Sequence, residues 1–284
     1  MSKTLLSIAV GVAISTLSAY AGAAAVVTTA NGANAAAIQS SVDAYRLSLG
    51  ALNANVAGSF GSGRREINWD GVPDALSAPN TLPANFFNVN SPRGVLFGTP
   101  GSGFEVSANA ASGTPVEFGN INASYGSIFS TFSAQRLFTA IGSNVTDVTF
   151  FVPGSNTPAL TSGFGAIFSD VDLPGTSIQY FDVNGTSLGT FLGPVSGVAN
   201  EGLSFLGARF TEGSVISRVR ITSGNAALGA GINDGGGIDL VVLDDFIYGE
   251  PLAAIPEPET YALMLAGLGI MGAVMRRRRQ QLPN

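Results

Sequence analysis

The sequence predicts an all-β protein, a β-sandwich of jelly-roll type, with one helix before the sandwich and a transmembrane helix at the C-terminus. Three observations predict the sandwich. Glycine makes up 37 of the 284 residues, about twice the ~7% usual in proteins. Short apolar runs recur along the chain at regular spacing, and Asn, Ser, Thr and Gly lie between them. Many short strands separated by such turns are typical of sandwiches.

The strand candidates follow one another through the second half of the chain. Two of them are joined by Asn184-Gly185, the two-residue signal of a tight hairpin. We expect strands at residues 145–152, 177–183, 186–191, 203–210, 215–221 and 238–248.

One stretch near the N-terminus has helical spacing. Within residues 35–53 four apolar residues recur every three or four positions, which predicts a single helix that packs on the core or covers one sheet. The Gly/Ser run 58–63 then predicts a flexible connection into the sandwich. The four apolar residues are Ile38, Val42, Tyr45 and Leu49.

The first 21 residues predict a secretory signal peptide. A lysine precedes the uncharged apolar run 5–17, and the A-x-A motif Ala19-Tyr20-Ala21 follows it, which is the order of a cleavable signal. We expect cleavage after Ala21, with Ala23 or Ala25 as alternatives. The apolar run is shorter than the ~20 residues of a bilayer-spanning helix, which argues against a permanent N-terminal anchor.

The other end of the chain combines an apolar stretch with a block of arginines. Residues 261–275 contain no charge and no proline. As a helix they would rise only ~22 Å against a hydrocarbon core of ~30 Å, which predicts a marginal transmembrane span. The segment has no polar face, so a buried amphipathic helix is disfavoured. The following residues predict a cytoplasmic stop-transfer block: Arg276, Arg277, Arg278 and Arg279.

Pro256-Glu257-Pro258, the apolar stretch with Gly267-Leu268-Gly269, and the arginine block together resemble the PEP-CTERM sorting signal of Gram-negative bacteria. Ile255 stands where valine is commoner. The resemblance implies that Pro256, Glu257 and Pro258 are a processing motif read by an exosortase, a membrane enzyme resembling a transpeptidase. It also implies a transient inner-membrane anchor, followed by transfer to the cell surface or the exopolysaccharide matrix. The resemblance covers about a tenth of the chain, so it implies an address and leaves the activity of the remainder open.

The composition excludes several chemistries. The chain has no Cys and no His, which excludes a disulfide framework, the usual Cys/His zinc sites, haem ligation by His, and nucleophiles paired with His. The formal net charge of −6 disfavours nucleic acid as a partner and permits cation binding. No phosphate-binding, dinucleotide or nucleophile-elbow motif is present. We therefore expect no catalytic residues and no required cofactor.

Asp170 and Asp172 are the first candidate calcium ligands. Their two-residue spacing, with Gly175 after them, is that of a calcium loop. An EF-hand is excluded because Pro174 offers no oxygen ligand and Phe181 stands where the closing Glu would be. A looser calcium site and a plain β-turn are the alternatives.

Asp244 and Asp245 are the second candidate pair. Adjacent residues of a strand face opposite sides, so one of these carboxylates points toward the interior. A buried carboxylate needs a cation, an arginine or several hydrogen-bond donors. Calcium is one prediction for this pair, and ion pairing with Arg218 or Arg220 of the preceding strand candidate is the other.

Trp69 is the only tryptophan. An exposed ring would stack on a sugar, whereas a buried ring would belong to the core. Ile67 before it and Asp70-Gly71 after it favour a buried strand end.

We divide the chain into a signal peptide (1–21), a helix with a Gly/Ser linker (22–63), a sandwich ectodomain (64–252) and a sorting signal (253–284). The predicted function is that of an exported surface or matrix protein whose ectodomain is structural or binds polysaccharide, with calcium as a speculative structural ion. The alternative is a polysaccharide-acting hydrolase, which would place two carboxylates across a cleft.

Overall fold

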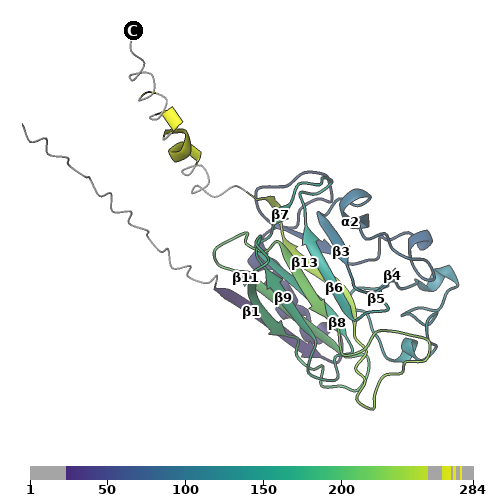
Figure 1. Ribbon diagram of the computed structural model, residues 1–284. Helices are drawn as coiled ribbons and strands as arrows, with labels where there is room; N and C mark the ends of the chain where they lie inside the picture. Colours follow the sequence, from purple (N-terminus) through teal and green to yellow (C-terminus); the bar gives the residue numbers. More distant parts are fainter. Residues whose placement is uncertain (1–23, 255–263, 270, 273–275, 277–284) are drawn as a thin grey trace, which may run out of the picture.

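The computed structural model describes residues 24–254, 264–269, 271–272 and 276 (Figure 1). The predicted signal peptide (1–21) and the motif Pro256, Glu257 and Pro258 lie outside the described residues, as do three of the four arginines, 277–279.

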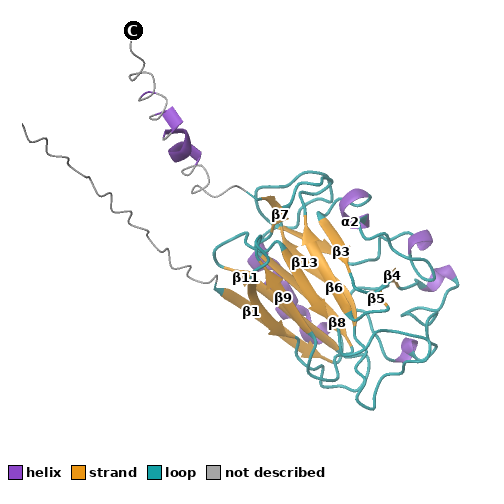
Figure 2. Ribbon diagram, in the orientation of Figure 1, coloured by secondary structure: helices purple, strands orange, loops and turns teal. Residues whose placement is uncertain are grey.

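Two antiparallel sheets that share one core form the body of the protein (Figure 2), so the all-β prediction is confirmed. The jelly-roll type stays a prediction. In the larger sheet the order is β1-β11-β8-β13-β5-β4, with β2 also on β13; in the smaller sheet it is β10-β9-β12-β6-β3. The larger sheet contains β1 (Ala25–Gly32), β2 (Arg64–Ile67), β4 (Gly103–Val106), β5 (Phe138–Ile141), β8 (Gly163–Ser169), β11 (Leu203–Phe210) and β13 (Val242–Gly249). The smaller contains β3 (Val95–Gly98), β6 (Val145–Phe150), β9 (Ser177–Phe181), β10 (Ser187–Leu192) and β12 (Arg218–Thr222); β7 (Ala159–Leu160) and β14 (Leu252–Ala253) form a separate pair.

Aromatic side chains fill the space between the two sheets. Phe150 of β6 lies with its ring centroid 6.1 Å from that of Phe164 on β8 and 5.6 Å from that of Tyr248 on β13. All three side chains are essentially inaccessible to solvent. Contacts of this kind between large buried rings join the sheets without any disulfide.

Trp69 belongs to this core. Its side chain is 1% exposed, and its ring stacks on that of Phe138 at a centroid distance of 4.1 Å. The indole N–H donates to the backbone carbonyl of Asp244 (2.8 Å). A sugar cannot reach this ring, so the sugar-stacking alternative is wrong and the core alternative is right.

The helix α1 (Ala35–Leu49) covers the outer face of the larger sheet (Figure 1). Asn34 is the N-cap, and its side chain accepts a hydrogen bond from Ala37 N–H (3.2 Å); Gly50 is the C-cap. Its buried residues are the four that the periodicity predicts: Ile38, Val42, Tyr45 and Leu49.

Two glycines let α1 approach the sheet closely. Gly165 of β8 and Gly207 of β11 lie opposite each other. A Cβ atom at Gly207 would lie 2.8 Å from the Tyr45 ring, closer than two carbon atoms can pack. The Tyr45 hydroxyl donates to the Ala208 carbonyl (3.0 Å). This close packing fixes the last turn of α1, which carries Arg46.

The segment before the sandwich differs from the prediction in two ways. β1 precedes α1 and pairs with β11 over its whole length, so residues 22–63 contribute a strand to the larger sheet and are not only a helix and a linker. The Gly/Ser run is also tied down: Gly58 N–H donates to the Pro153 carbonyl (2.8 Å), and Phe60 N–H donates to the Glu250 carboxylate (3.1 Å). Glu250 in turn forms a buried ion pair with Arg65 (2.7 Å).

The remaining helical segments are short. Those of the folded body are α2 (Phe86–Val89), η1 (Asp74–Leu76), η2 (Ala110–Ser112) and η3 (Tyr125–Ser127). Toward the C-terminus, residues 264–269, 271–272 and 276 are helical. Among the residues that the structure describes, none of the helices has the length and apolar character needed to traverse a bilayer. The anchor expected at 261–275, part of which is undescribed, stays a prediction.

Candidate functional site

Three aspartates from two loops meet at one end of the larger sheet. Asp170 directly follows β8, and Asp172 lies two residues further on. Asp234 comes from the loop between β12 and β13. Because β8 and β13 are neighbours in the sheet, these loops lie side by side, and one carboxylate oxygen from each aspartate lies within 4.8 Å of the others. We call this group the acidic cluster.

Asp170 is the most unusual member of the acidic cluster. Its side chain is 0% exposed, and neither carboxylate oxygen accepts a hydrogen bond from any described residue. The Glu201 N–H near it donates to the Ile128 carbonyl instead (2.7 Å). Burial, and then the charges of nearby aspartates, raise the pKa of Asp170 to about 8. Oδ1 of Asp172 is likewise buried without a partner.

Hydrogen bonds hold the loop that carries Asp234. Leu240 N–H donates to Oδ1 of Asp234 (2.9 Å), and Asp239 N–H donates to the side chain of Asn225 (2.9 Å). The Asp239 carboxylate accepts from Asp172 N–H (2.9 Å) and so joins the two loops. Sequence reasoning missed Asp234 and Asp239. The signal was the run Asp-Gly-Gly-Gly-Ile-Asp, 234–239, in which glycines with positive φ separate two acids.

Asp244 and Asp245 lie elsewhere in the sheet and are not part of the acidic cluster. Both are buried, at 0% and 2% exposure, next to a register shift between β13 and β8. Asp244 accepts from Phe132 N–H (2.6 Å) and Ser133 N–H (3.3 Å). Asp245 accepts from the Ser133 hydroxyl (2.7 Å) and from Arg46 (3.0 Å). Burial, and then the charge of Asp245, raise the pKa of Asp244 well above its usual value.

The arginine partner of this pair was predicted on the wrong element. Arg218 and Arg220 both pair with Asp147 on β6, each at 2.8 Å. The partner of Asp245 is Arg46, which α1 brings to the sheet from nearly 200 positions away in the sequence. The donors that surround Asp244 and Asp245 occupy their oxygens, so calcium at this second pair has no support in the geometry.

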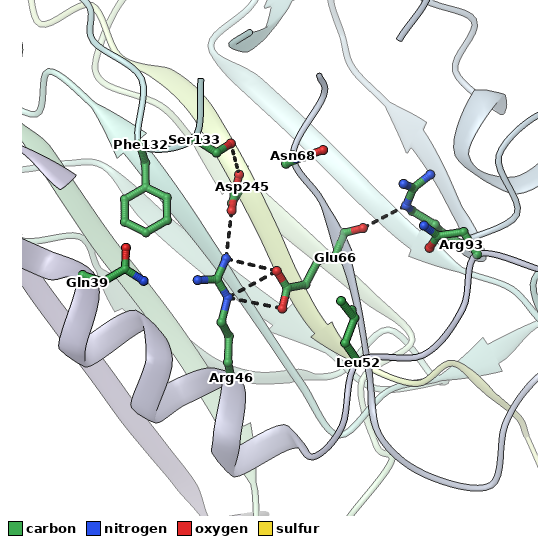
Figure 3. Close-up of a pocket in the computed structure, with 10 residues that line it drawn as sticks. Gln39, Arg46, Leu52, Glu66, Asn68, Arg93, Phe132, Ser133 and Asp245 are labelled. Carbon is green, nitrogen blue, oxygen red and sulfur yellow. Dashed lines mark hydrogen bonds and ion pairs between the residues drawn. The ribbon is translucent and has the colours of Figure 1, made fainter. Parts of the chain in front are cut away.

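Arg46 is also the centre of a surface pocket (Figure 3). Its guanidinium group contacts Glu66 of β2 through Nε (3.2 Å) and Nη2 (3.0 Å) and contacts Asp245 through Nη2 (3.0 Å). The same group lies 5.8 Å from the centre of the Phe132 ring. One arginine therefore joins the helix, the sheet and the loop before β5.

The pocket has a volume of about 420 Å³ and a mainly polar lining, within the range of ligand-binding pockets. The lining contains both hydrogen-bond donors and acceptors and a single aromatic ring, that of Phe132, a combination suited to hydroxyl groups. Glu66 and Asp245 both bind Arg46, so neither carboxylate is free of a charged partner. The lining residues are Gln39, Arg46, Leu52, Asn55, Glu66, Asn68, Arg93, Phe132, Ser133 and Asp245.

The fold and sites thus define a β-sandwich with a partly buried acidic cluster and a polar pocket. The family model of the PEP-CTERM protein-sorting motif matches residues 254–279, so the chain carries this signal, which implies export and sorting to the cell surface. No curated protein matches the chain. One similar solved structure is a glycoside hydrolase family 43 arabinoxylan arabinofuranohydrolase from Bacillus subtilis in complex with cellotetraose. It is 14% identical with a TM-score of 0.25, over 54% of this chain and 25% of that chain. A likeness this weak supports no conclusion, and the family of the sandwich is not identified.

Proposed function

We propose that the protein is a non-catalytic component of the bacterial cell surface or exopolysaccharide matrix, sorted there by an exosortase, with a β-sandwich of jelly-roll type that binds polysaccharide. The observation that carries the sorting part is the motif match at 254–279. The observation that carries the binding part is the polar pocket around Arg46.

The end of the folded body suits the sorting step. β14 pairs with β7, and Ala254 N–H reaches the Pro158 carbonyl (3.5 Å). Pro256 follows only two residues later, so the processing motif begins directly after the last anchored strand. We expect exosortase to read the motif while residues 261–275 hold the protein transiently in the inner membrane.

The mass and location of the C-terminus in the producing bacterium test the sorting step. We expect the wild type to lose residues 261–284 and to leave the membrane, whereas a variant with Pro256, Glu257 and Pro258 replaced by alanine stays anchored. Wild-type protein that keeps its full tail in the membrane would contradict the sorting step.

Sugar binding is proposed for the pocket because its chemistry matches polysaccharide hydroxyls. Amide side chains of Gln39, Asn55 and Asn68 line it and offer both donors and acceptors. The Phe132 ring adds an apolar surface of the kind that packs against a sugar face. None of the three amides forms a hydrogen bond with Arg46, whose partners are Asp43, Glu66 and Asp245, so replacing them removes no partner of these ion pairs.

Co-sedimentation of the purified protein with the exopolysaccharide of the producing bacterium tests the binding part. Replacing Gln39, Asn55 and Asn68 together by alanine should weaken binding at least about tenfold, since each lost polar contact is worth about 0.5–1.5 kcal/mol. The matched control replaces three amides of the opposite sheet and its loops, Asn156, Gln179 and Asn184, and should bind as the wild type does. Equal binding by the pocket variant and the wild type would overturn this site.

The rival hydrolase has no specific support in the pocket. Glu66 and Asp245 are its two carboxylates, and both bind the same guanidinium group. The acid and the base of glycoside cleavage must each reach the substrate, whereas both of these carboxylates bind the same arginine. We therefore expect no release of reducing ends from the polysaccharide that the protein binds.

A further inference from the structure

The acidic cluster has a feature that neither sorting nor sugar binding uses. Both carboxylate oxygens of Asp170 and Oδ1 of Asp172 are buried and accept no hydrogen bond from the described residues. A buried acceptor without a donor costs free energy. The Asp170 side chain is directed at the oxygens of Asp172 and Asp234, all within 4.8 Å, so its missing partner belongs between the three aspartates.

No described arginine supplies that partner. The ion pairs formed by the described arginines go to Asp43, Glu66, Asp74, Asp147, Asp245 and Glu250, and none goes to Asp170, Asp172 or Asp234. A proton on Asp170 would let this residue donate one hydrogen bond to a neighbouring carboxylate, but its second oxygen would still have no donor. A bound cation would satisfy carboxylate oxygens from all three aspartates together.

We propose that Asp170, Asp172 and Asp234 bind one Ca²⁺ ion, which ties the loop after β8 to the loop before β13. The ligands are all hard carboxylate oxygens, which suit Ca²⁺ and Mg²⁺. Mg²⁺ gives up its water molecules reluctantly, whereas Ca²⁺ accepts six to eight oxygens in flexible geometry. The sealed surroundings of Asp170 therefore favour Ca²⁺.

Groups outside the acidic cluster hold the loop of Asp234 in place. The Tyr125 hydroxyl lies 2.9 Å from the carbonyls of Gly229 and Ile232 and also accepts from Gly229 N–H (3.0 Å). Asn122 donates to the Ile232 carbonyl (3.0 Å). These contacts keep the loop against the sheet, so binding an ion there requires little ordering of the chain. The ion would crosslink an exported domain that has no cysteine.

The test is calcium titration of the whole purified protein after EDTA treatment, by calorimetry and thermal unfolding. We expect one ion per chain and a rise in Tm of about 5–10 °C when calcium exceeds its Kd about 100-fold. Asp170→Asn should bind calcium at least about tenfold more weakly, yet melt in EDTA no lower than the wild type, because the amide can donate to the neighbouring carboxylates.

Two further variants keep the test decisive. Asp234→Asn changes a half-exposed ligand and should also lose most calcium binding, even if Asp170→Asn fails to fold. Asp43→Asn changes an exposed aspartate of α1, whose side chain is 52% exposed, and should bind calcium as the wild type does. A wild-type Tm that calcium leaves unchanged, an equal rise with Mg²⁺, or full binding by Asp234→Asn would overturn the proposal.

Discussion

Asp170 and Asp244 are both fully buried aspartates at neighbouring strands of one sheet, but their carboxylates have opposite surroundings. Asp244 accepts two backbone N–H groups from the loop before β5, whereas Asp170 accepts none from the described residues and faces two further aspartates. The pKa is raised at both, and burial is the first cause at both. The two aspartates therefore differ in their hydrogen-bond donors and not in their burial, and the missing donors at Asp170 are the reason that we propose a cation there.

The sharpest test of this comparison is the same substitution at both positions. Asp244→Ala leaves the N–H groups of Phe132 and Ser133 without an acceptor and should lower the free energy of unfolding by about 2–4 kcal/mol. Asp170→Ala leaves no donor without an acceptor, so in EDTA the free energy of unfolding should change by less than about 1 kcal/mol. Urea unfolding of both variants measures this, and similar losses at the two positions would break the comparison.

Arg46→Met should have the next largest effect. It should lower the free energy of unfolding by about 2–3 kcal/mol at neutral pH, because Asp245 and Glu66 lose the cation that they share. The effect should depend on pH. Burial raises the pKa of Asp245 and Arg46 lowers it, so the variant raises this pKa further. A carboxyl whose pKa is higher in the folded protein than in the unfolded chain lowers the free energy of unfolding as the pH rises. The loss begins near the unfolded pKa of about 4 and is complete above the folded pKa.

The free energy of unfolding of Arg46→Met should therefore be only slightly below that of the wild type near pH 4, and the difference should grow toward pH 8. Unfolding curves across this range measure it. A deficit that stays constant with pH would mean that Arg46 acts through packing on Phe132 and not through its charge.

A smaller effect is expected at Asn225, which closes the loop of the acidic cluster. Its side chain accepts from Asp239 N–H and donates to the Gly237 carbonyl, both at 2.9 Å. Asn225→Ala should leave the Asp234 loop less ordered and weaken calcium binding by about tenfold, or about 1.4 kcal/mol. Calorimetry with calcium measures this, and unchanged affinity would show that the loop is ordered without Asn225.

The smallest effect is expected at Asp147, a partly exposed carboxylate whose arginine partners are more exposed than it is. Asp147 pairs with Arg218 and Arg220, whose side chains are 29% and 45% exposed. Asp147→Asn should cost less than about 1 kcal/mol and less still at high salt. A larger loss of stability would mean that burial and hydrogen-bond donors do not determine how much each aspartate contributes to stability.

The sequence predicted the elements whose patterns are regular. The α1 periodicity placed all four buried residues. β9 and β10 form the expected hairpin around Asn184-Gly185, but the connection is longer than the predicted two residues, because β9 ends at Phe181 and β10 begins at Ser187. β8 was missed because all seven of its residues are buried: the core lies on one face and α1 on the other, so no alternation marks it. β1 was missed because it pairs with β11, far along the chain.

The candidate sites were predicted in part for similar reasons. Asp170 and Asp172 were found from their spacing, which is local. Asp234 belongs with them only because β8 and β13 are neighbours. Arg46 likewise meets Asp245 through the packing of α1 on glycines of two strands. These are contacts of tertiary structure, which residue spacing does not contain.

The most direct test of the central claim is the position of a calcium ion in crystals of the protein grown with calcium. Anomalous scattering at long wavelength should give one strong peak between Asp170, Asp172 and Asp234, with oxygens at about 2.3–2.6 Å. It should give none beside Asp244 and Asp245. A peak at the second pair, or none at the first, would contradict the account.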